Sequence, residues 1–393
     1  MPSELSTHAH DASFAPLVEG AEGAEGAEGI GRGAAESERT AAGTLGDRAY
    51  QDAILPRVSR TFALTIPELP EDLRDVVANG YLLCRIADTI EDEATLAPHE
   101  KRRFHEMFAA AVAGEVDAQA FADELAPRLS AGTLDAEREL VSGAARVVRI
   151  AHRFEPRKRR ALARCVRVMC GGMARFAEKD RAGLADVGEL HDYCYFVAGV
   201  VGEMLTELFC SHDAAIAARR EGLERLAVSF GHALQMTNIL KDVWDDLDRG
   251  ACWLPRDLLA EAGIDVERFS PDCDRAALAR CLEQLIAIAH GHLRDSLEYT
   301  LLIPAREPGI RRFCLWALGM AVLTLRKIHR RLDFRRSREV KITRRSVRAT
   351  ILASNLVLRS DLALRLLFAA VARGLPLASV ERYRGPARAS STS

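Results

Sequence analysis

The segment YLLCRIADTIED, residues 81–92, joins an apolar helical pattern to a cluster of carboxylates. Its apolar residues recur at spacings of three and four, which is the period of a helix with a buried face. Residues three and four positions apart share one face of a helix, so the side chains of Asp88, Glu91 and Asp92 point in the same direction. The segment therefore predicts a core helix that presents three carboxylates together.

A second segment, QMTNILKDVWDD at residues 235–246, carries a similar combination. At roughly 100° per residue, five polar side chains of this helix fall within about 100° of one another. They are Gln235, Asn238, Asp242, Asp246 and Arg249. The other faces of the helix are largely apolar, apart from His232, so the polar stripe is expected to face an interior site.

Two buried acidic clusters predict a metal site. Burying a carboxylate costs several kcal/mol unless the group is paired or binds a metal. Magnesium prefers carboxylate oxygens and commonly bridges a protein to substrate phosphates, and manganese can take its place. Two clusters on separate helices can therefore clamp a diphosphate, whose charge the metal neutralises as a carbon–oxygen bond breaks. The alternative for each cluster alone is a solvated helix face.

The helical pattern extends through most of the chain, and β-branched alternating runs are scarce. Some stretches are apolar on more than one face, as in LAVSFGHAL at 226–234, which is typical of helices surrounded by others. The sequence predicts one all-α domain, residues 46–375, formed by a large helical bundle around a central hydrophobic cavity. Its helices are predicted at 46–57, 71–95, 99–114, 134–152, 156–178, 186–210, 219–248, 273–302, 308–333 and 343–372.

The ends and the composition set limits on location and partners. The repeat EGAEGAEGAEG within residues 1–45 predicts a disordered tail, and residues 376–393 predict a polar C-terminal tail. With no secretory signal and no uncharged apolar run of roughly 18 residues, we expect a cytoplasmic protein without a transmembrane anchor. Nine cysteines without metal-type spacing are expected to be small buried hydrophobic residues. A formal net charge of −2 gives no field that favours nucleic acid, and no obligate protein partner is expected.

Four segments, in this order, resemble motifs of the squalene/phytoene synthase family. They are VSRTFALTI at 58–66, the acidic segment at 81–92, YCYFVAGVVG at 193–202 and the second acidic segment at 235–246. The resemblance spans roughly residues 50–370 and implies the isoprenoid synthase fold. It also implies head-to-head condensation of two prenyl diphosphates. Asp88 and Asp92, with Glu91, would bind one set of metal ions, and Asp242 and Asp246 the opposite set.

Four residues near the first motif are candidate diphosphate contacts. Arg60 and Arg85 carry guanidinium groups, whose paired donors match phosphate oxygens. Ser59 and Tyr81 can donate to the same oxygens. The alternative for either arginine is an ordinary salt bridge.

The third motif and the second acidic motif supply further candidates. Tyr193 matches the tyrosine that the resemblance implies in proton removal, although a core tyrosine is the simpler reading of a buried phenol. Lys241 stands where family members often carry arginine, and keeps a positive charge beside Gln235 and Asn238 for the diphosphate. Gly199 and Gly202, with Ala198, would let prenyl chains pass close to the backbone or would permit tight helix packing.

Two segments are similar to those of squalene synthases within the family. They are FCLWALGMAVLTL at 313–325 and VKI at 340–342. The second implies that Lys341 binds a phosphate of NADPH, with farnesyl diphosphate as the substrate. The arginine-rich run at 330–348 would bind cofactor phosphates or form a solvated basic face, with peripheral contact to anionic lipid. Alternatives within the family are a dehydrosqualene, phytoene or presqualene diphosphate synthase, and alternatives outside its chemistry are a terpene cyclase or a non-enzymatic assembly factor.

Overall fold

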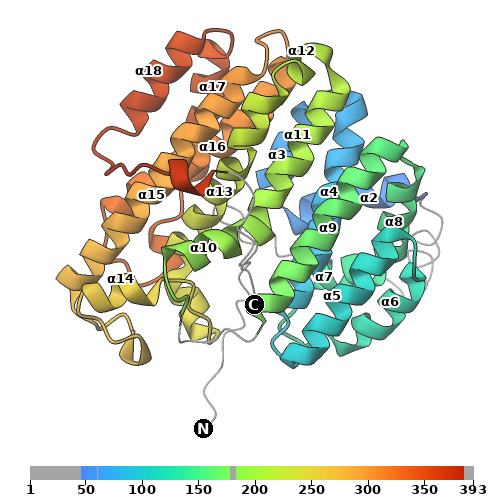
Figure 1. The fold of residues 1–393 in the computed structure, drawn as a ribbon, viewed down its shortest axis with the longest axis horizontal. Coiled ribbons are helices and arrows are strands. Elements are labelled where there is room, and N and C mark those ends of the chain that lie inside the picture. Colours follow the sequence, from blue (N-terminus) through green and yellow to red (C-terminus); the bar gives the residue numbers. More distant parts are fainter. Residues whose placement is uncertain (1–45, 60, 178–182, 385–393) are drawn as a thin grey trace, which may run out of the picture.

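The computed structural model describes residues 46–59, 61–177 and 183–384, and within these ranges the fold is all-α (Figure 1). The only β pairing there is an isolated bridge between Leu184 and Pro255. The long helices are α2 (Asp47–Val58), α4 (Glu71–Asp92), α5 (Pro98–Ala113), α9 (Pro156–Phe176), α11 (Val200–His212), α13 (Arg220–Asp248), α15 (Arg275–Leu302), α16 (Pro308–His329), α17 (Arg344–Val357) and α18 (Asp361–Val371). The shorter ones are α3 (Thr61–Thr65), α6 (Ala118–Leu125), α7 (Asp135–Ser142), α8 (Ala144–Arg153), α10 (Val187–Cys194), α12 (Ala214–Ala217) and α14 (Arg256–Glu261). The predicted all-α bundle is confirmed.

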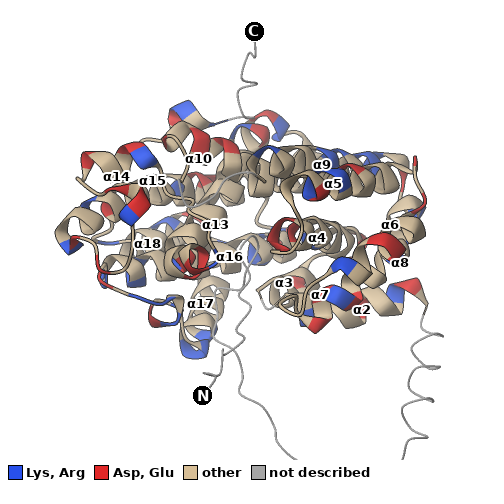
Figure 2. Ribbon diagram, turned by 90° about the horizontal axis from the view of Figure 1, so that it is seen from below, with Lys and Arg blue, Asp and Glu red and all other residues tan. Residues whose placement is uncertain are grey.

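Helix α13 forms the centre of the bundle, where it packs against α11, α15 and α16. In Figure 1, α4 to α9 lie on one side of this centre and α14 to α18 lie on the other. Seen from below in Figure 2, the acidic end of α4 lies near the middle of the molecule, between these two halves. The arrangement brings the first acidic segment to the central helix that carries the second.

Three predicted helices are each divided in the structure. The one predicted at 134–152 is two helices that meet at Gly143, where an added Cβ would lie 2.5 Å from the Cζ atom of the Tyr50 ring. The one predicted at 343–372 is α17 and α18, and the hydroxyl of Ser360 caps α18 by accepting a hydrogen bond from Ala363 N at 3.3 Å. The one predicted at 186–210 contains a π-helical turn at Tyr195–Gly199. The sequence analysis also missed the short helices α3, α6, α12 and α14.

Glycines set the close contact between this π-helical segment and α13. A Cβ atom at Gly231 would lie 2.6 Å from the backbone nitrogen of Gly199, and one at Gly202 would lie 2.8 Å from the carbonyl carbon of Ala227. A larger residue would collide with backbone, which cannot rotate away. Of the two roles expected for the small residues of 198–202, tight helix packing is therefore the one seen at Gly202.

Two helical segments are long and apolar enough to cross a membrane by length and composition, Val187–His212 and Pro308–His329. Their most apolar windows are 67% and 72% buried within the fold, as expected for core helices of a globular protein. All nine cysteines are free, and every one except Cys273 is buried. The tail predicted at residues 1–45 lies outside the described residues. Residues 376–384 pack on α15, with Ala378 N donating to Ala287 O at 3.0 Å.

Candidate active site

The first acidic cluster occupies the last turns of α4. Asp88 is fully buried, Glu91 is partly buried, and Asp92 at the end of the helix remains exposed to water. Loss of hydration and the repulsion of Asp92 and Asp88 raise the pKa of Glu91 well above its usual range. Although water reaches Asp92, the surrounding protein removes enough hydration to raise its pKa as well. Three carboxylates held together in this way attract a cation.

Ion pairs behind the cluster fix its position. The Arg85 guanidinium is 2% exposed, pairs closely with Glu137 of α7, and lies 3.9 Å from a carboxylate oxygen of Asp88. One residue beyond α4, Glu93 accepts hydrogen bonds from Thr95 N at 3.0 Å and Ser130 N at 2.8 Å. These bonds and two more from the hydroxyls of Thr95 and Thr133 hold the pKa of Glu93 at about 2. The Glu93 carboxylate therefore stabilises the loop and is not available as a metal ligand. The predicted continuation of the helix to residue 95 is wrong because Glu93 turns the chain at this point.

The second cluster lies near the end of α13. Asp242 and Asp246 are buried, whereas Asp245 points away and accepts a hydrogen bond from Ser337 Oγ at 2.5 Å. Burial raises the pKa of Asp242, and it raises the pKa of Asp246 to about 8. Lys241 is 1% exposed, and its ammonium lies 3.0 Å from Asp242. The helical spacing therefore predicted correctly which carboxylates face inward.

Electrostatic interactions connect the two clusters. The charge of Asp92 contributes to the raised pKa of Asp246, and the charge of Asp246 contributes to that of Glu91. Arg249 pairs closely with Asp246, and its positive charge also opposes the rise in the pKa of Asp92. The structure thus brings together two segments that are more than 140 residues apart in the sequence. Together they form one acidic site between α4 and α13.

This donor set fits magnesium. Buried within it are the Glu91 Oε1 atom and the Gln235 amide nitrogen, and neither has a hydrogen-bond partner within the described structure. An unpaired carboxylate oxygen suits a hard cation, and an unpaired amide donor suits a phosphate oxygen. Asn238 lies on the same face, and its side-chain oxygen accepts a hydrogen bond from Lys241 Nζ at 3.4 Å. A magnesium ion bound to these carboxylates and a phosphate oxygen bound to the amide would satisfy both groups.

Tyr193 reaches the same site from the end of α10. Its ring stacks on Trp253, with centroids 4.0 Å apart and planes 9° apart, and it meets Phe176 edge to face. Burial, followed by the charges of Glu91, Asp92 and Asp246, raises the pKa of the phenol well above its usual range. The structure therefore places a neutral hydroxyl close to both acidic clusters.

Comparison with known proteins identifies the family. A profile of squalene/phytoene synthases matches residues 55–346. The chain belongs to the squalene/phytoene synthase family. It is 31% identical over 287 residues to squalene synthase BSS of Botryococcus braunii and 30% identical over 281 residues to the squalene synthase of Eremothecium gossypii. Each alignment covers 71% of the chain but only 58% and 61% of those relatives, respectively.

Solved structures of the family share the fold. TcSQS in complex with the ligand BPH1237 has a TM-score of 0.68 and 25% identity, covering 86% of this chain and 95% of that one. A ligand-bound dehydrosqualene synthase has a TM-score of 0.59 and 20% identity, covering 80% and 97% of the two chains. The isoprenoid synthase fold expected from the sequence is therefore present.

The opening motif of the family lies beside the first cluster. Tyr81 Oη donates to Val58 O at 3.0 Å, and Ser59 Oγ accepts from Phe62 N at 3.0 Å. The single hydroxyl proton of Tyr81 is used in this bond, so donation to a diphosphate oxygen would require Tyr81 to release Val58. The substrate contacts of Ser59 and Tyr81 stay predictions. Arg60 lies outside the described residues. An apolar pocket continues from this point between α3, α4, α11 and α16, and its lining includes Phe62, Tyr81, Met204 and Phe313.

The arginine-rich segment at 330–348, which the sequence predicts to bind cofactor phosphates, packs against the end of α13 that carries the second cluster. Trp244 Nε1 donates to Phe334 O at 2.7 Å, and Lys327 Nζ donates to the carbonyl oxygen of Lys341. The partly buried Lys341 is close enough for its charge to oppose the rise that burial causes in the pKa of Asp242. The structure thus places Lys341 at the acidic site, although 99 residues separate it from Asp242 in the sequence.

Two residues of the site were missed by the sequence analysis. Glu137 pairs with Arg85 from a separate helix, and no local pattern around it signals that contact. Trp253 supports Tyr193 from the loop after α13, which backbone bonds from Leu184 N to Leu254 O and from Arg256 N to Leu184 O hold in place. An aromatic residue directly after an acidic motif is the only sequence signal that could have indicated Trp253.

Proposed function

We propose that this chain is a magnesium-dependent prenyltransferase that joins two farnesyl diphosphates head to head and, with NADPH, reduces the product to squalene. The observation that carries the proposal is the pair of acidic clusters on α4 and α13, with the Tyr193 hydroxyl close to carboxylates of both. The names of the most similar relatives point to the same activity. Manganese is expected to replace magnesium because its ligand preferences are similar.

The first step requires departure of a diphosphate. Magnesium supplies the positive charge that stabilises this leaving group. Asp88, Asp92, Asp242 and Asp246 would hold the metal ions, with Glu91 as a further ligand. Gln235, Asn238 and Lys241 lie on the adjoining face of α13 and would orient the phosphate oxygens. Arg85 fixes Asp88 from behind. The narrow apolar pocket lined by Phe62 and Phe313 would have to widen to accept a prenyl chain.

Tyr193 would act at the reacting carbons. When the first carbon–oxygen bond breaks, its electron pair leaves with the diphosphate, and the allylic cation adds to the double bond of the second substrate. A proton must then be lost to close a cyclopropane ring. The raised pKa of Tyr193 makes the phenol a poor base by itself. Tyr193 would therefore accept this proton while passing its own to the departing diphosphate.

The reductive step would depend on Lys341. Its charge acts on Asp242, and Lys341 belongs to the arginine-rich segment at 330–348, where phosphate groups of NADPH would be bound. Bound here, NADPH would supply the hydride that reduces the cation formed when the second diphosphate leaves. The family also includes enzymes without this step, so a dehydrosqualene, phytoene or presqualene diphosphate synthase is the alternative.

The deciding experiment is incubation of the purified protein with farnesyl diphosphate and magnesium, with and without NADPH, followed by mass spectrometry of the products. Squalene formed only with NADPH is the expected result. Presqualene diphosphate or dehydrosqualene formed regardless of NADPH would contradict the reductive step, and turnover of geranylgeranyl diphosphate alone would contradict the substrate. Asp242→Asn is the inactive control, because it preserves shape while removing a metal ligand.

Peripheral contact with the cytoplasmic membrane surface is a further part of the proposal. Helices α17 and α18 lie at the edge of the fold (Figure 1), where Leu356 and Leu362 are 86% and 69% exposed. Arg348 and Arg359 are exposed at helical spacing from Leu356. Exposed leucines flanked by arginines suit an anionic lipid surface. Beneath them, an apolar pocket lies between α15, α16, α17 and α18.

A further inference from the structure

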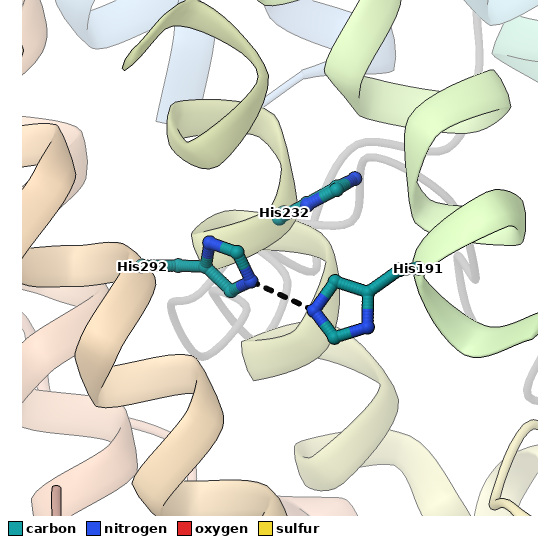
Figure 3. A group of neighbouring side chains, drawn as sticks. All are labelled: His191, His232 and His292. Atoms are coloured by element: carbon teal, nitrogen blue, oxygen red, sulfur yellow. Dashed lines mark hydrogen bonds between the residues drawn. The ribbon is translucent and has the colours of Figure 1, made fainter. Parts of the chain in front are cut away.

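Three buried histidines meet in the bundle, and they are separate from the carboxylates of the two acidic clusters. His191, His232 and His292 come from α10, α13 and α15, respectively (Figure 3). One nitrogen of each lies within 4.8 Å of the others, and the three ring centroids are 5.0–5.2 Å apart. Three imidazoles bound to one tetrahedral metal at ~2.1 Å have centroids roughly 5 Å apart. The rings therefore already have the spacing of a metal site.

Hydrogen bonds determine where two of these rings carry their protons. His191 Nδ1 lies 2.7 Å from Val187 O, which can only accept, so this nitrogen is the donor. Ser229 donates its hydroxyl proton to Asp295 at 3.0 Å, and its oxygen lies 3.1 Å from His292 Nδ1. Because that hydroxyl proton is already used, His292 Nδ1 must donate to Ser229. Each neutral ring then has a lone pair on Nε2.

Those two lone pairs face each other. His191 Nε2 and His292 Nε2 are 2.9 Å apart, as the dashed line in Figure 3 marks. Two lone pairs at this distance repel unless a proton or a metal cation lies between them. A proton would leave a buried imidazolium without a free counter-ion, since Arg384 already neutralises Asp295 through bonds of 2.6 and 2.7 Å. Burial also lowers the pKa of His191 to about 4.

The surroundings of His232 indicate whether a proton or a metal ion lies between His191 and His292. It is 2% exposed, and neither of its ring nitrogens makes a hydrogen bond of acceptable geometry within the described structure. The His191 backbone comes close enough to affect the pKa of His232 but does not satisfy either nitrogen. A proton shared by the other two rings would leave both nitrogens unsatisfied, at a cost of ~1–3 kcal/mol each. A metal ion can take a lone pair from all three rings.

We propose that His191, His232 and His292 form a transition-metal site and that zinc is the ion it binds. Imidazole ligands select first-row transition metals, whereas magnesium prefers the carboxylates of the acidic site. No other histidine, cysteine or carboxylate of the described residues joins this group, so water completes the tetrahedron. The nitrogens of a tetrahedral zinc site lie roughly 3.4 Å apart. His191 Nε2 and His292 Nε2, now 2.9 Å apart, would separate by about 0.5 Å as zinc binds, and His232 would turn toward them.

The site holds three helices together next to the catalytic groups. His191 precedes Tyr193 by two residues, and His232 precedes Gln235 by three, so the metal fixes α10 and α13 directly beside the acidic site. Tyr383 covers the site from outside, with its ring stacked on His191 at a centroid distance of 3.5 Å. The three histidines are therefore positioning residues, and their metal stabilises the fold without taking part in the chemistry.

The test measures metal content, which is independent of activity. Full-length protein with a tag that contains no histidine is purified from zinc-containing medium in excess magnesium, and its metals are measured by mass spectrometry. We expect about one zinc per chain. We also expect 1,10-phenanthroline, which leaves magnesium in place, to remove the zinc and lower Tm by about 5 °C or more. Cobalt added to the stripped protein should give the visible absorption of a tetrahedral site.

His232→Phe separates a metal site from simple packing, with His290→Gln as the matched control. His290 lies on α15 but bonds to Pro376 O at 2.9 Å, outside the cluster. If zinc is bound, His232→Phe loses the zinc and the cobalt spectrum and has a lower Tm, whereas His290→Gln keeps both signals. If the cluster is only packed, removing two unsatisfied nitrogens leaves Tm unchanged or raises it. That result would overturn the proposal, and so would less than about 0.1 zinc per chain in zinc-saturated wild type. If His232→Phe does not fold, the wild-type zinc and cobalt measurements decide the question.

Discussion

Replacing Gly231 by alanine should disturb both the fold and the catalytic geometry. The added Cβ would lie 2.6 Å from the backbone nitrogen of Gly199 and closer still to the carbonyl group of Ala198. This is roughly 1 Å short of an ordinary van der Waals separation. Both obstacles are backbone, so relief requires the π-helical turn to move away from α13.

The expected magnitudes follow from that displacement. Overpacking of this kind costs ~1–3 kcal/mol, and the better helix propensity of alanine returns up to about 1 kcal/mol. We therefore expect Gly231→Ala to lower the free energy of unfolding by about 2 kcal/mol. Tyr193 lies two residues before the turn, and a shift of about 1 Å at a catalytic group can reduce the rate about 100-fold.

Urea unfolding and steady-state kinetics with farnesyl diphosphate measure the two effects. Gly171→Ala in α9 is the matched control, because nothing lies within 4 Å of its added Cβ. This variant should gain ~0.5–1 kcal/mol of stability and keep its kcat. A Gly231→Ala protein as stable as wild type, with kcat within about threefold, would refute the argument that this backbone contact positions Tyr193.

Four further predictions test the proposed site and surface. Without magnesium the folded protein keeps a proton on Asp246 that the unfolded chain releases near pH 4. The free energy of unfolding should therefore fall as pH rises from about 4 to 8. Tm measured across this pH range should show the fall, and Asp246→Asn should make the fall smaller. Tyr193→Phe should lower kcat at least about 100-fold with little change in Tm, whereas a matching loss of stability would indicate a packing role. Lys341→Ala should raise the KM for NADPH about tenfold or more while presqualene diphosphate still forms, and a changed KM for farnesyl diphosphate alone would place Lys341 at the diphosphate instead. Leu356→Glu should reduce sedimentation with phosphatidylglycerol vesicles at least about tenfold without changing activity in detergent, and unchanged sedimentation would exclude α17 as the contact.

The sequence predicted the features that depend on local helical spacing. Asp88, Asp242 and Asp246 face inward as expected, because residues three and four apart share a helix face. The outward position of Asp245 follows from the same period, even though its partner Ser337 could not be foreseen. The helical period thus predicted the inward carboxylates of α13 and Asp88 of α4, whereas Asp92 lies at the exposed end of its helix.

Features that depend on long-range contact could not be predicted in the same way. The break at Gly143 depends on the ring of Tyr50, and Glu137 finds Arg85 from another helix. His191 and His292 are 101 residues apart, and no spacing rule connects them. In each case the partner is brought close only by the packing of the bundle.

Helix α13 explains why an unstable acidic site can exist in a well-packed protein. The raised pKa values of Asp242 and Asp246 show that the folded chain disfavours these charges until a cation arrives. The same helix is fixed by backbone contact at Gly231 and, in our proposal, by zinc at His232. A helix anchored in this way cannot move to separate its carboxylates. The unfavourable burial of their charges is therefore relieved only when metal and diphosphate bind. Loss of either anchor should therefore weaken magnesium binding even though neither residue touches the acidic site.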